Sequence, residues 1–433
     1  MTNLLDRLLD DRLVDPDGTD ILHVPTRHIA IRASLAGSEA ELVSAAGIGQ
    51  NLVLVSDPAT RAVLGARVHA DLSGQGGFSL REVVLGPAPA PTIEAVAALQ
   101  AKIGTADGLV AIGSGSLNDI VKLAAFRLGL AYVVFATAPS MNGYTSSSAA
   151  IIDHGHKKSL PARAPVGAFF DLTVLCDAPP RMIRSGFGDS LCRATAQTDW
   201  LMAHLLLDRP YRRMPFVLLE PDEDALIASA DRLLAKDVAA MERLVRTLVM
   251  SGFGMTLCGS SEPASQGEHL ISHYIDMRGD PAWPMSYHGE HIAVTTLTMA
   301  RIQEGILNAP APPLLKGEPP DRQSFLDRYG EELGTSCWEE FVRKRIDAPA
   351  AEALNQRLAS GWPDIRKRLL AVGRSAATLQ TALVTIGAPT TPEEIWVPAP
   401  FYREAAMSAR EIRNRFCFLD LAAESGQLAG LVS

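Results

Sequence analysis

The chain contains 433 residues, a length that predicts two or three domains at ~150 residues each and allows a large buried core. Forty basic side chains against 49 acidic ones give a formal net charge of −9, and no block of Lys and Arg stands out, so we expect no nucleic acid partner. No apolar run approaches the ~18 residues of a membrane span, and the N-terminal residues lack the basic start of a secretion signal. The five cysteines are scattered and form no CxxC pair, which predicts a cytoplasmic protein without a thiolate-held metal.

In roughly the first 180 residues, short aliphatic or β-branched runs alternate with helix-like stretches. The strand-like runs are 52–55, 109–112 and 132–135, and the helix-like stretches are 92–103 and 117–128. This alternation is typical of a parallel sheet covered by helices. The sequence therefore predicts an α/β, Rossmann-like nucleotide-binding domain over residues 1–180.

Beyond residue 180 the strand pattern fades and long amphipathic stretches follow. They are 191–207, 224–250, 289–303, 350–370 and 408–423. Residues 308–320 hold five prolines in thirteen positions, which excludes a helix interior and predicts a surface loop. The second domain, residues 181–433, is predicted to be all-helical and to bind metal and substrate.

A glycine-rich turn follows the run at 109–112. Gly113 and Gly115 flank a serine, and the turn opens a helix-like stretch. Glycines let the backbone approach a pyrophosphate closely, and the unpaired N–H groups and positive dipole end of the helix attract an anion. A dinucleotide over Gly113, Gly115 and Ser116 and an ordinary tight turn between a strand and a helix explain these residues equally well.

Asp57 ends the run at 52–55 and precedes Pro58. In an ordinary dinucleotide fingerprint the acid lies ~20 residues after the glycines and a third glycine is present, and this chain has neither. Asp57 can accept both ribose hydroxyls of an NAD adenosine if its strand lies beside the glycine strand. Otherwise Asp57 caps the helix that begins at Pro58.

A second polar turn, FATAPSMNGYTSSS at residues 135–148, follows the third strand-like run. Small hydroxyl residues at the carboxyl end of a strand are typical of the crevice where open α/β sheets hold ligands. Two adjacent strands with such turns favour a ligand crevice over a solvated loop.

One acid and three histidines form the most informative pattern. Asp189 lies in GFGD, which we expect near the start of a helix, and His288 begins another helix. His269 and His273 are four residues apart, which places both imidazoles on one face of a helix, an arrangement that is more often structural than ligating. One carboxylate and two imidazoles form the ligand set of catalytic zinc and related divalent metals. The third histidine can then bind substrate or relay a proton, a role for which His291 competes.

Together these motifs resemble the metal-dependent glycerol-1-phosphate dehydrogenases, relatives of iron-type alcohol dehydrogenases, glycerol dehydrogenase and dehydroquinate synthase. The likeness covers about residues 53–419 and is nearest to the bacterial branch associated with arabinose operons. It rests on GSGSLNDIVK, ATAPSMNGYTS, GFGD, PASQGEHLISH, YHGEHIAV and REIRNRFCFLD, in that order. The resemblance implies a dehydroquinate synthase-like fold.

The resemblance also implies roles for individual residues. Asp189, His269 and His288 would hold the metal, and His273 would contact the substrate. The residues that it places at the nicotinamide cofactor are Asp57, Gly113, Ser114, Gly115, Ser116, Asp119, Thr137, Ser140 and Ser146. The cofactor would be NAD, with NADP open, and the metal would be zinc, with nickel, manganese or ferrous iron as alternatives.

Two positions depart from the family pattern. Asn142 stands where the family has a substrate-binding Asp, and a neutral amide can bind a hydroxyl but cannot act as a base. Glu262 stands where the pattern has Arg, and its charge would repel a phosphate. Lys157 and Lys158 become the nearest alternative phosphate ligands, unless they only form a solvated turn.

These features predict a reversible, metal-dependent NAD(P)H oxidoreductase that reduces dihydroxyacetone phosphate to sn-glycerol 1-phosphate. The metal, held between the two domains, would stabilise charge on the ketone oxygen while His273, through Asn142 and water, delivers a proton. The alternatives are a dehydrogenase of another polyol or phosphorylated ketose, a dehydroquinate synthase-like sugar-phosphate cyclase, and a non-enzymatic nucleotide sensor. The expected partners are a phosphorylated triose or polyol and a second copy of the chain in a homodimer, without a membrane.

Overall fold

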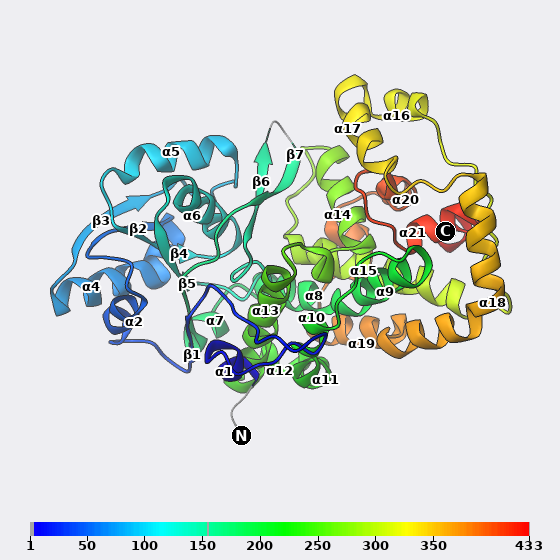
Figure 1. Ribbon diagram of the computed structural model, residues 1–433. Coiled ribbons are helices and arrows are strands. Elements are labelled where there is room, and N and C mark those ends of the chain that lie inside the picture. The colour runs from blue at the N-terminus through cyan, green and yellow to red at the C-terminus, as the bar shows by residue number, and fades with distance from the viewer. Residues whose placement is uncertain (1–3, 154–155, 433) are drawn as a thin grey trace. The chain divides into compact units, whose positions relative to one another are not determined.

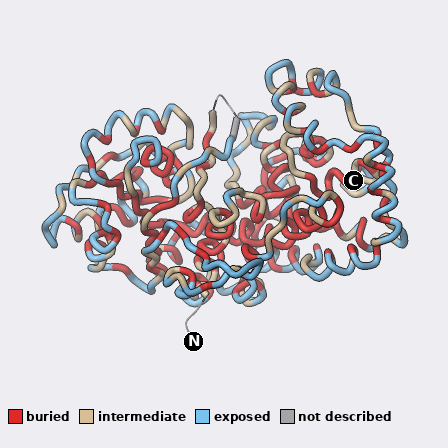
Figure 2. Tube along the Cα trace, in the orientation of Figure 1, coloured by how far each residue is buried: buried red, intermediate tan, exposed pale blue. Residues whose placement is uncertain are grey.

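The computed structural model describes residues 4–153 and 156–432 of the chain (Figure 1). It confirms the predicted fold class, since a parallel sheet forms in the front part and helices form most of the rest. Figure 2 shows buried residues along the strands and inner helices and exposed residues along the outer helices.

The contacts divide the chain into two compact units that interleave in sequence. The sheet unit comprises Met1–Ser190 and Arg213–Ser261, and the helical unit comprises Leu191–Arg212 and Glu262–Ser433. The sequence predicted a single boundary after residue 180, whereas the helices of residues 213–261 group with the sheet.

Close packing of α13 (Val238–Cys258) explains why this segment belongs to the sheet unit. A Cβ atom at Gly252 would overlap Thr145 in the loop after β5 (Ala131–Ala136). Thr145 Oγ1 also donates to the backbone carbonyl of Val249 at 2.7 Å. The helix and the loop therefore form one packed assembly.

The predicted helix at 224–250 is wrong as a single element. The structure divides it among α11 (Glu220–Ala228), α12 (Ala230–Leu233) and α13. Lys236 adopts a positive φ of 59°, which a helix interior does not allow, and Asp237 then caps α13 by accepting from the N–H of Ala240 at 2.9 Å.

The sheet contains six parallel strands in the order β1-β8-β5-β4-β2-β3. Their bounds are β1 His28–Arg32, β2 Asn51–Ser56, β3 Ser79–Val84, β4 Gly108–Gly113, β5 Ala131–Ala136 and β8 Gly167–Asp171. The three predicted strand runs are confirmed as β2, β4 and β5. A hairpin of β6 (Ser148–Asp153) and β7 (His156–Pro161) interrupts the chain between β5 and β8.

Helices cover both faces of this sheet (Figure 1). The helix pair on one face is α5 (Ile93–Ile103) with α6 (Gly115–Leu128), and the pair on the other is α2 (Glu39–Ala46) with α4 (Ala66–Gln75). The remaining helices of this unit are α1 Leu4–Leu9, α3 Pro58–Thr60, α7 Leu172–Cys176, α8 Pro180–Leu191 and α10 Met214–Val217. The predicted helices at 92–103 and 117–128 are confirmed as α5 and α6.

The helical unit packs its helices around one apolar core. Its helices are α9 Arg193–Leu207, α14 Gly267–Arg278, α15 His288–Leu307, α16 Arg322–Tyr329, α17 Glu331–Phe341, α18 Ala348–Val372, α19 Ala376–Ile386, α20 Ala399–Ser408, α21 Phe418–Glu424 and α22 Leu428–Leu431. The predicted helices at 191–207, 289–303 and 350–370 are confirmed. The segment Ala348–Ile386 has the length and composition of a membrane span, but it comprises two helices and contains Pro363.

The predicted helix at 408–423 is wrong. Helix α20 ends at Ser408 and α21 begins at Phe418, since the buried carboxylate of Asp420 turns back to accept from the N–H of Cys417 at 3.0 Å. Lys344 Nζ, also buried, donates to the same carboxylate at 2.9 Å. These contacts, with the ion pair to Arg410 at 3.2 Å, compensate the cost of burying Asp420.

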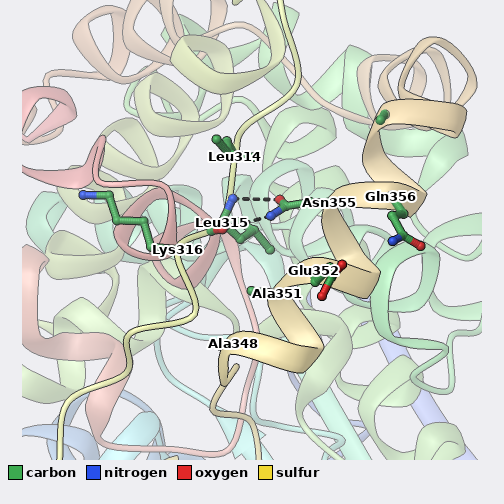
Figure 3. Close-up of a pocket in the computed structure, with 9 residues that line it drawn as sticks. Leu314, Leu315, Lys316, Ala348, Ala351, Glu352, Asn355 and Gln356 are labelled. Carbon is green, nitrogen blue, oxygen red and sulfur yellow. Dashed lines mark hydrogen bonds between the residues drawn. The ribbon is translucent and has the colours of Figure 1, made fainter.

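The proline-rich segment 308–320 lies outside any helix or strand, as predicted. The Asn355 side chain on α18 fixes it by accepting from the N–H of Leu315 at 2.8 Å and donating to its carbonyl at 2.9 Å (Figure 3). An open groove of about 560 Å³ lies between this segment and α18.

Candidate functional site

The sheet has a topological switch point at the carboxyl ends of β2 and β4. From β2 the chain continues to β3 on one side, and from β4 it continues to β5 on the other side. Open α/β sheets bind ligands in the crevice where such connections diverge. The predicted cofactor residues that end β2 and β4 therefore lie at the expected edge, because the two strands pair directly in parallel.

The glycine turn forms the predicted junction of strand and helix. Strand β4 ends at Gly113, Ser114 occupies the N-cap position, and α6 begins at Gly115. A Cβ atom at Gly113 would come within 2.9 Å of the Leu117 side chain, so the tight turn requires glycine. At Gly115 a Cβ atom would meet only the Met141 side chain, at 3.8 Å, which leaves the helix N-terminus open to an anion.

Asp57 is confirmed as a helix cap. One of its carboxylate oxygens accepts from the N–H of Thr60 at 2.8 Å, and the Thr60 hydroxyl accepts from the N–H of Asp57 at 3.0 Å. The other half of the prediction, that its strand lies beside the glycine strand, is also confirmed. A contact between Asp57 and the cofactor ribose stays a prediction.

The loop after β5 begins against the glycine turn and contains the predicted Thr137, Ser140 and Ser146. The N–H of Thr137 donates to the Gly113 carbonyl at 3.3 Å, which joins the ends of two neighbouring strands. The Ser140 carbonyl accepts from Ser185 Oγ at 3.1 Å. The structure therefore brings these hydroxyl residues to the same edge as the glycines.

Lys122 anchors this loop, and sequence reasoning missed it. Its side chain is fully buried on α6, and Nζ donates to the Gly143 carbonyl at 2.6 Å, to Ser146 Oγ at 3.1 Å and to the Ser148 carbonyl at 3.0 Å. Burial lowers the pKa of Lys122, and the carboxylate of Asp119 at 3.7 Å opposes that shift. A lysine inside the apolar run of α6 was the available signal.

Asp119, a predicted cofactor residue, faces the hairpin. Its carboxylate accepts from the N–H of Ala150 in β6 at 3.3 Å, beside the ammonium of Lys122. These contacts connect α6 with β6, and a cofactor contact for Asp119 stays a prediction.

Asp189 and Asn142 adjoin each other in the sheet unit. The N–H of Asn142 donates to Asp189 Oδ2 at 2.8 Å, and Asp189 is buried. The sequence placed Asp189 near the start of a helix, whereas it lies in the last turn of α8. Gly186, one turn earlier, lies so close to the Pro139 carbonyl that a Cβ atom would overlap it, which explains the glycine in GFGD.

The three predicted histidines converge within the helical unit. His269 and His273 share one face of α14, with ring centroids 6.1 Å apart, and His288 is the first residue of α15. The rings of His269 and His288 lie 5.1 Å apart, and those of His273 and His288 lie 6.4 Å apart. Neutral imidazoles gathered in this way are suited to a divalent cation such as zinc, nickel or ferrous iron.

His291 has a different environment. Its Nδ1 atom lies 3.5 Å from the Asp276 carboxylate on α14. This contact joins α14 and α15 one helical turn after His273 and His288. This contact gives His291 a structural partner on α14.

Of the predicted phosphate ligands, Lys158 is half-exposed and its Nζ lies 2.9 Å from Asp153 Oδ2 across the hairpin. The side chain of Lys157 lies outside the part of the chain that the structure describes. Glu262 has a nearby cation in Arg415, which donates to the Ser265 carbonyl. Burial lowers the pKa of Arg415, and the charges of Glu262 and Glu268 oppose that shift.

Comparison with known proteins agrees with this architecture. Residues 30–179 match the family model described as iron-containing alcohol dehydrogenase. The fold is similar to that of maleylacetate reductase from Agrobacterium tumefaciens, with a TM-score of 0.61 and 17% identity over 95% of this chain and 96% of that one. It is equally similar to glycerol dehydrogenase from Schizosaccharomyces pombe, with a TM-score of 0.61 and 15% identity over 97% and 93% of the two chains.

Proteins similar in sequence identify the type of dehydrogenase more closely. The glycerol-1-phosphate dehydrogenase [NAD(P)+] of Bacillus subtilis is 30% identical over 294 residues, which span 66% of this chain and 74% of that protein. The enzyme of the same name from Bacillus licheniformis is 29% identical over 328 residues, or 76% and 70% of the two chains. The chain therefore belongs to the glycerol-1-phosphate dehydrogenase family within the iron-containing alcohol dehydrogenases.

Proposed function

We propose that this protein is a metal-dependent dehydrogenase that reduces dihydroxyacetone phosphate with NAD(P)H to sn-glycerol 1-phosphate, reversibly. The observation that carries the proposal is the convergence of His269, His273 and His288 on two adjoining helices of a chain in this family. Relatives named for this activity in Bacillus species supply the substrate.

His269 and His288 are the proposed imidazole ligands of the metal, and Asp189 is the proposed carboxylate ligand. The ring separation of 5.1 Å suits two nitrogen ligands of one ion, and Asp189 is a buried acid whose position the N–H of Asn142 fixes. Zinc is our first choice, with nickel or iron as alternatives. When bound, the cation polarises the ketone oxygen and the nicotinamide supplies a hydride.

The cofactor is proposed to lie over the switch point of the sheet. Gly115 and the N-terminus of α6 would hold its pyrophosphate, because the first N–H groups of a 14-residue helix point there. Asp57 would bind the adenosine ribose with the carboxylate oxygen that does not cap α3. A carboxylate at the ribose repels a 2′-phosphate, which favours NAD over NADP.

His273 is the proposed proton donor to the reduced substrate oxygen. It shares a face of α14 with His269, so its ring lies beside the proposed ligands. Asn142 would orient a substrate hydroxyl through its side-chain amide without exchanging a proton itself. Each turnover then consumes one NAD(P)H and one proton.

The test is metal content and turnover of His269→Ala against a matched control. His204→Ala removes another histidine of the same unit, one that bonds to the Arg209 carbonyl at 2.7 Å and stacks on Tyr211. We expect His269→Ala to lose bound metal and ketone-dependent NADH oxidation together, and His204→Ala to retain both. Full metal content and turnover in His269→Ala would refute the ligand assignment.

The substrate is tested by comparing dihydroxyacetone phosphate with dihydroxyacetone in NADH oxidation by the metal-loaded protein. We expect net NADH consumption with dihydroxyacetone phosphate and a much higher KM for dihydroxyacetone. NADH consumption with dihydroxyacetone but not with its phosphate would instead favour a polyol dehydrogenase.

A homodimer and a cytoplasmic location also stay predictions.

A further inference from the structure

Glu268 is a buried carboxylate next to His269 that no sequence pattern identified. It is 0% exposed in the first turn of α14 and accepts three hydrogen bonds. The donors are the N–H of Gln266 at 2.8 Å, Thr195 Oγ1 at 3.2 Å and, at 3.0 Å, His269 Nδ1. Two of these donors fix the carboxylate, so that it can orient the third.

The bond to His269 determines which nitrogen of the imidazole carries the proton. The carboxylate acts as the acceptor towards Gln266 and Thr195, and in the same role towards His269 it accepts the 3.0 Å hydrogen bond from the proton on Nδ1. In a neutral ring the lone pair then lies on Nε2. A carboxylate behind a ligating histidine fixes the tautomer and ring orientation and raises the basicity of the ligating nitrogen.

We propose that Glu268 is a positioning residue that holds His269 as the Nδ1–H tautomer and presents Nε2 to the divalent metal. This inference rests on the proposed function, because it takes His269 as a ligand. Glu268 adds a role that the family motif around His269 does not assign.

The groups around Glu268 stabilise a carboxylate in this buried position. Burial lowers the pKa of the half-buried Arg415 guanidinium, the charge of Glu268 opposes that shift, and this nearby cation offsets part of the cost of burying the carboxylate. Arg415 also donates to the Ser265 carbonyl, immediately before α14. The N-terminus of α14, which begins at Gly267, is favourable for a negative charge as well.

A competing arrangement is that Glu268 itself binds the metal. Ligand atoms of Cys192, Glu268 and His269 lie within 4.8 Å of one another. That set would use the Cys192 thiolate, with a Zn–S distance of ~2.3 Å instead of ~2.0–2.1 Å for nitrogen. Removing Cys192 therefore separates the two arrangements.

The first experiment measures the zinc affinity of the full-length apo-protein by competition with a chelator. We expect Glu268→Ala to weaken zinc binding about 10- to 100-fold. Glu268→Gln should lose less, because its carbonyl oxygen can replace Oε1 while its amide donates to Thr195 Oγ1. Unchanged affinity in Glu268→Ala would overturn the proposal, and so would an equal loss in Cys192→Ala.

Asp420→Asn is the matched control for loss of stability. Asp420 is another buried acid of the helical unit, and its partners Cys417, Lys344 and Arg410 lie outside α14 and α15. We expect Asp420→Asn to lower thermal stability and leave zinc affinity unchanged. Equal weakening of zinc binding in Asp420→Asn and Glu268→Ala would reduce Glu268 to a structural role and overturn the proposal.

The second experiment reads the tautomer directly, without metal. Nitrogen-15 shifts of labelled histidines in the apo-protein, with His269 assigned from His269→Asn, should report Nδ1–H in the wild type. In Glu268→Ala the proton should redistribute towards Nε2. An Nε2–H tautomer in the wild type would refute the inference even if His269→Ala, by losing metal, supports the proposed function.

Discussion

The two units fix their predicted site segments with buried ionisable groups of opposite type, an amine in one and a carboxyl in the other. In the sheet unit, Lys122 donates to the carbonyls of Gly143 and Ser148 and so fixes the loop after β5. In the helical unit, Asp199 accepts from the N–H groups of Gly267 and Phe418 and so fixes the start of α14.

The difference follows from the backbone groups that each segment leaves unpaired. A loop that leaves a strand presents carbonyl oxygens, and a cationic side chain with three donors satisfies several of them at once. A helix N-terminus presents N–H groups, and a carboxylate satisfies those. The buried amine or carboxyl group thus matches the backbone groups that each segment leaves unpaired, and the comparison predicts opposite responses to pH.

The largest effect is expected for Lys122→Met. It removes the ammonium donor from the Gly143 and Ser148 carbonyls, which are left to share the single hydroxyl hydrogen of Ser146, and it removes the cation beside Asp119. A buried acceptor without a donor costs about 1–3 kcal/mol. We expect a loss of about 3 kcal/mol or more in the free energy of unfolding, together with weaker NADH binding, measured by urea unfolding and cofactor fluorescence. Lys102→Met, on the exposed side of α5, should change stability by less than about 0.5 kcal/mol.

The pH dependence sharpens this prediction. Burial lowers the pKa of Lys122 below the value of 10.5 that it regains on unfolding, so the unfolded chain binds more protons between the two values. The contribution of Lys122 to stability therefore rises as the pH approaches 10.5. A wild-type advantage over Lys122→Met that falls with rising pH would contradict the assignment.

Asp199→Asn is expected to have the next largest effect, with the opposite response to pH. The amide cannot accept both backbone N–H bonds, which costs about 1–3 kcal/mol. Burial and the charge of Glu268 raise the pKa of Asp199 from 3.8 to about 8, so the folded chain binds the extra proton between these values. The stability of the wild type relative to the variant should then fall as the pH rises from 3.8 to about 8, and it should level off at higher pH. Urea unfolding of the apo-protein at several pH values measures this trend.

The sequence predicted the elements whose signals are local. Strands β2, β4 and β5 are unbroken apolar runs, and the glycines before α6 and the histidine pair on α14 follow from spacing. The edge strands β1 and β3 were missed because their exposed positions interrupt the apolar pattern. The predicted helix at 408–423 failed because α21 begins separately at Phe418, where Asp420 caps the helix and pairs with the distant Lys344.

The sequence predicted which histidines form the candidate site, but it did not predict the hydrogen bonds that hold the site residues in place. His269, His273 and His288 could be named from spacing and resemblance, and they do converge. Lys122 and Glu268 could not, because a charged residue inside an apolar stretch has no sequence pattern that names its partner. Lys122 bonds to a carbonyl 21 positions away, and Glu268 is fixed partly by Thr195, 73 positions away.

Gly115→Ala should separate stability from cofactor binding. A Cβ atom there meets only Met141, at 3.8 Å, and alanine at the first position of α6 lowers the entropy of the unfolded chain, so we expect about 0.4–1 kcal/mol of added stability. The same methyl group would lie where a pyrophosphate approaches the backbone, which should weaken NADH binding about 10-fold. Zinc affinity should not change, and a loss of zinc would contradict the separate roles of the two regions.

The smallest effect on stability is expected for Lys158→Ala. A half-exposed pair such as Lys158 with Asp153 contributes only about 0.2–1 kcal/mol, because water screens it, so urea unfolding should barely change. If Lys158 exchanges Asp153 for the substrate phosphate, the KM for dihydroxyacetone phosphate should rise severalfold while the KM for dihydroxyacetone stays constant. Lys102→Met again serves as a control, since it removes a surface lysine elsewhere on the same unit. An unchanged ratio of the two KM values would show that Lys158 only stabilises the hairpin, and the anchoring cation for the phosphate would then have to come from outside β7.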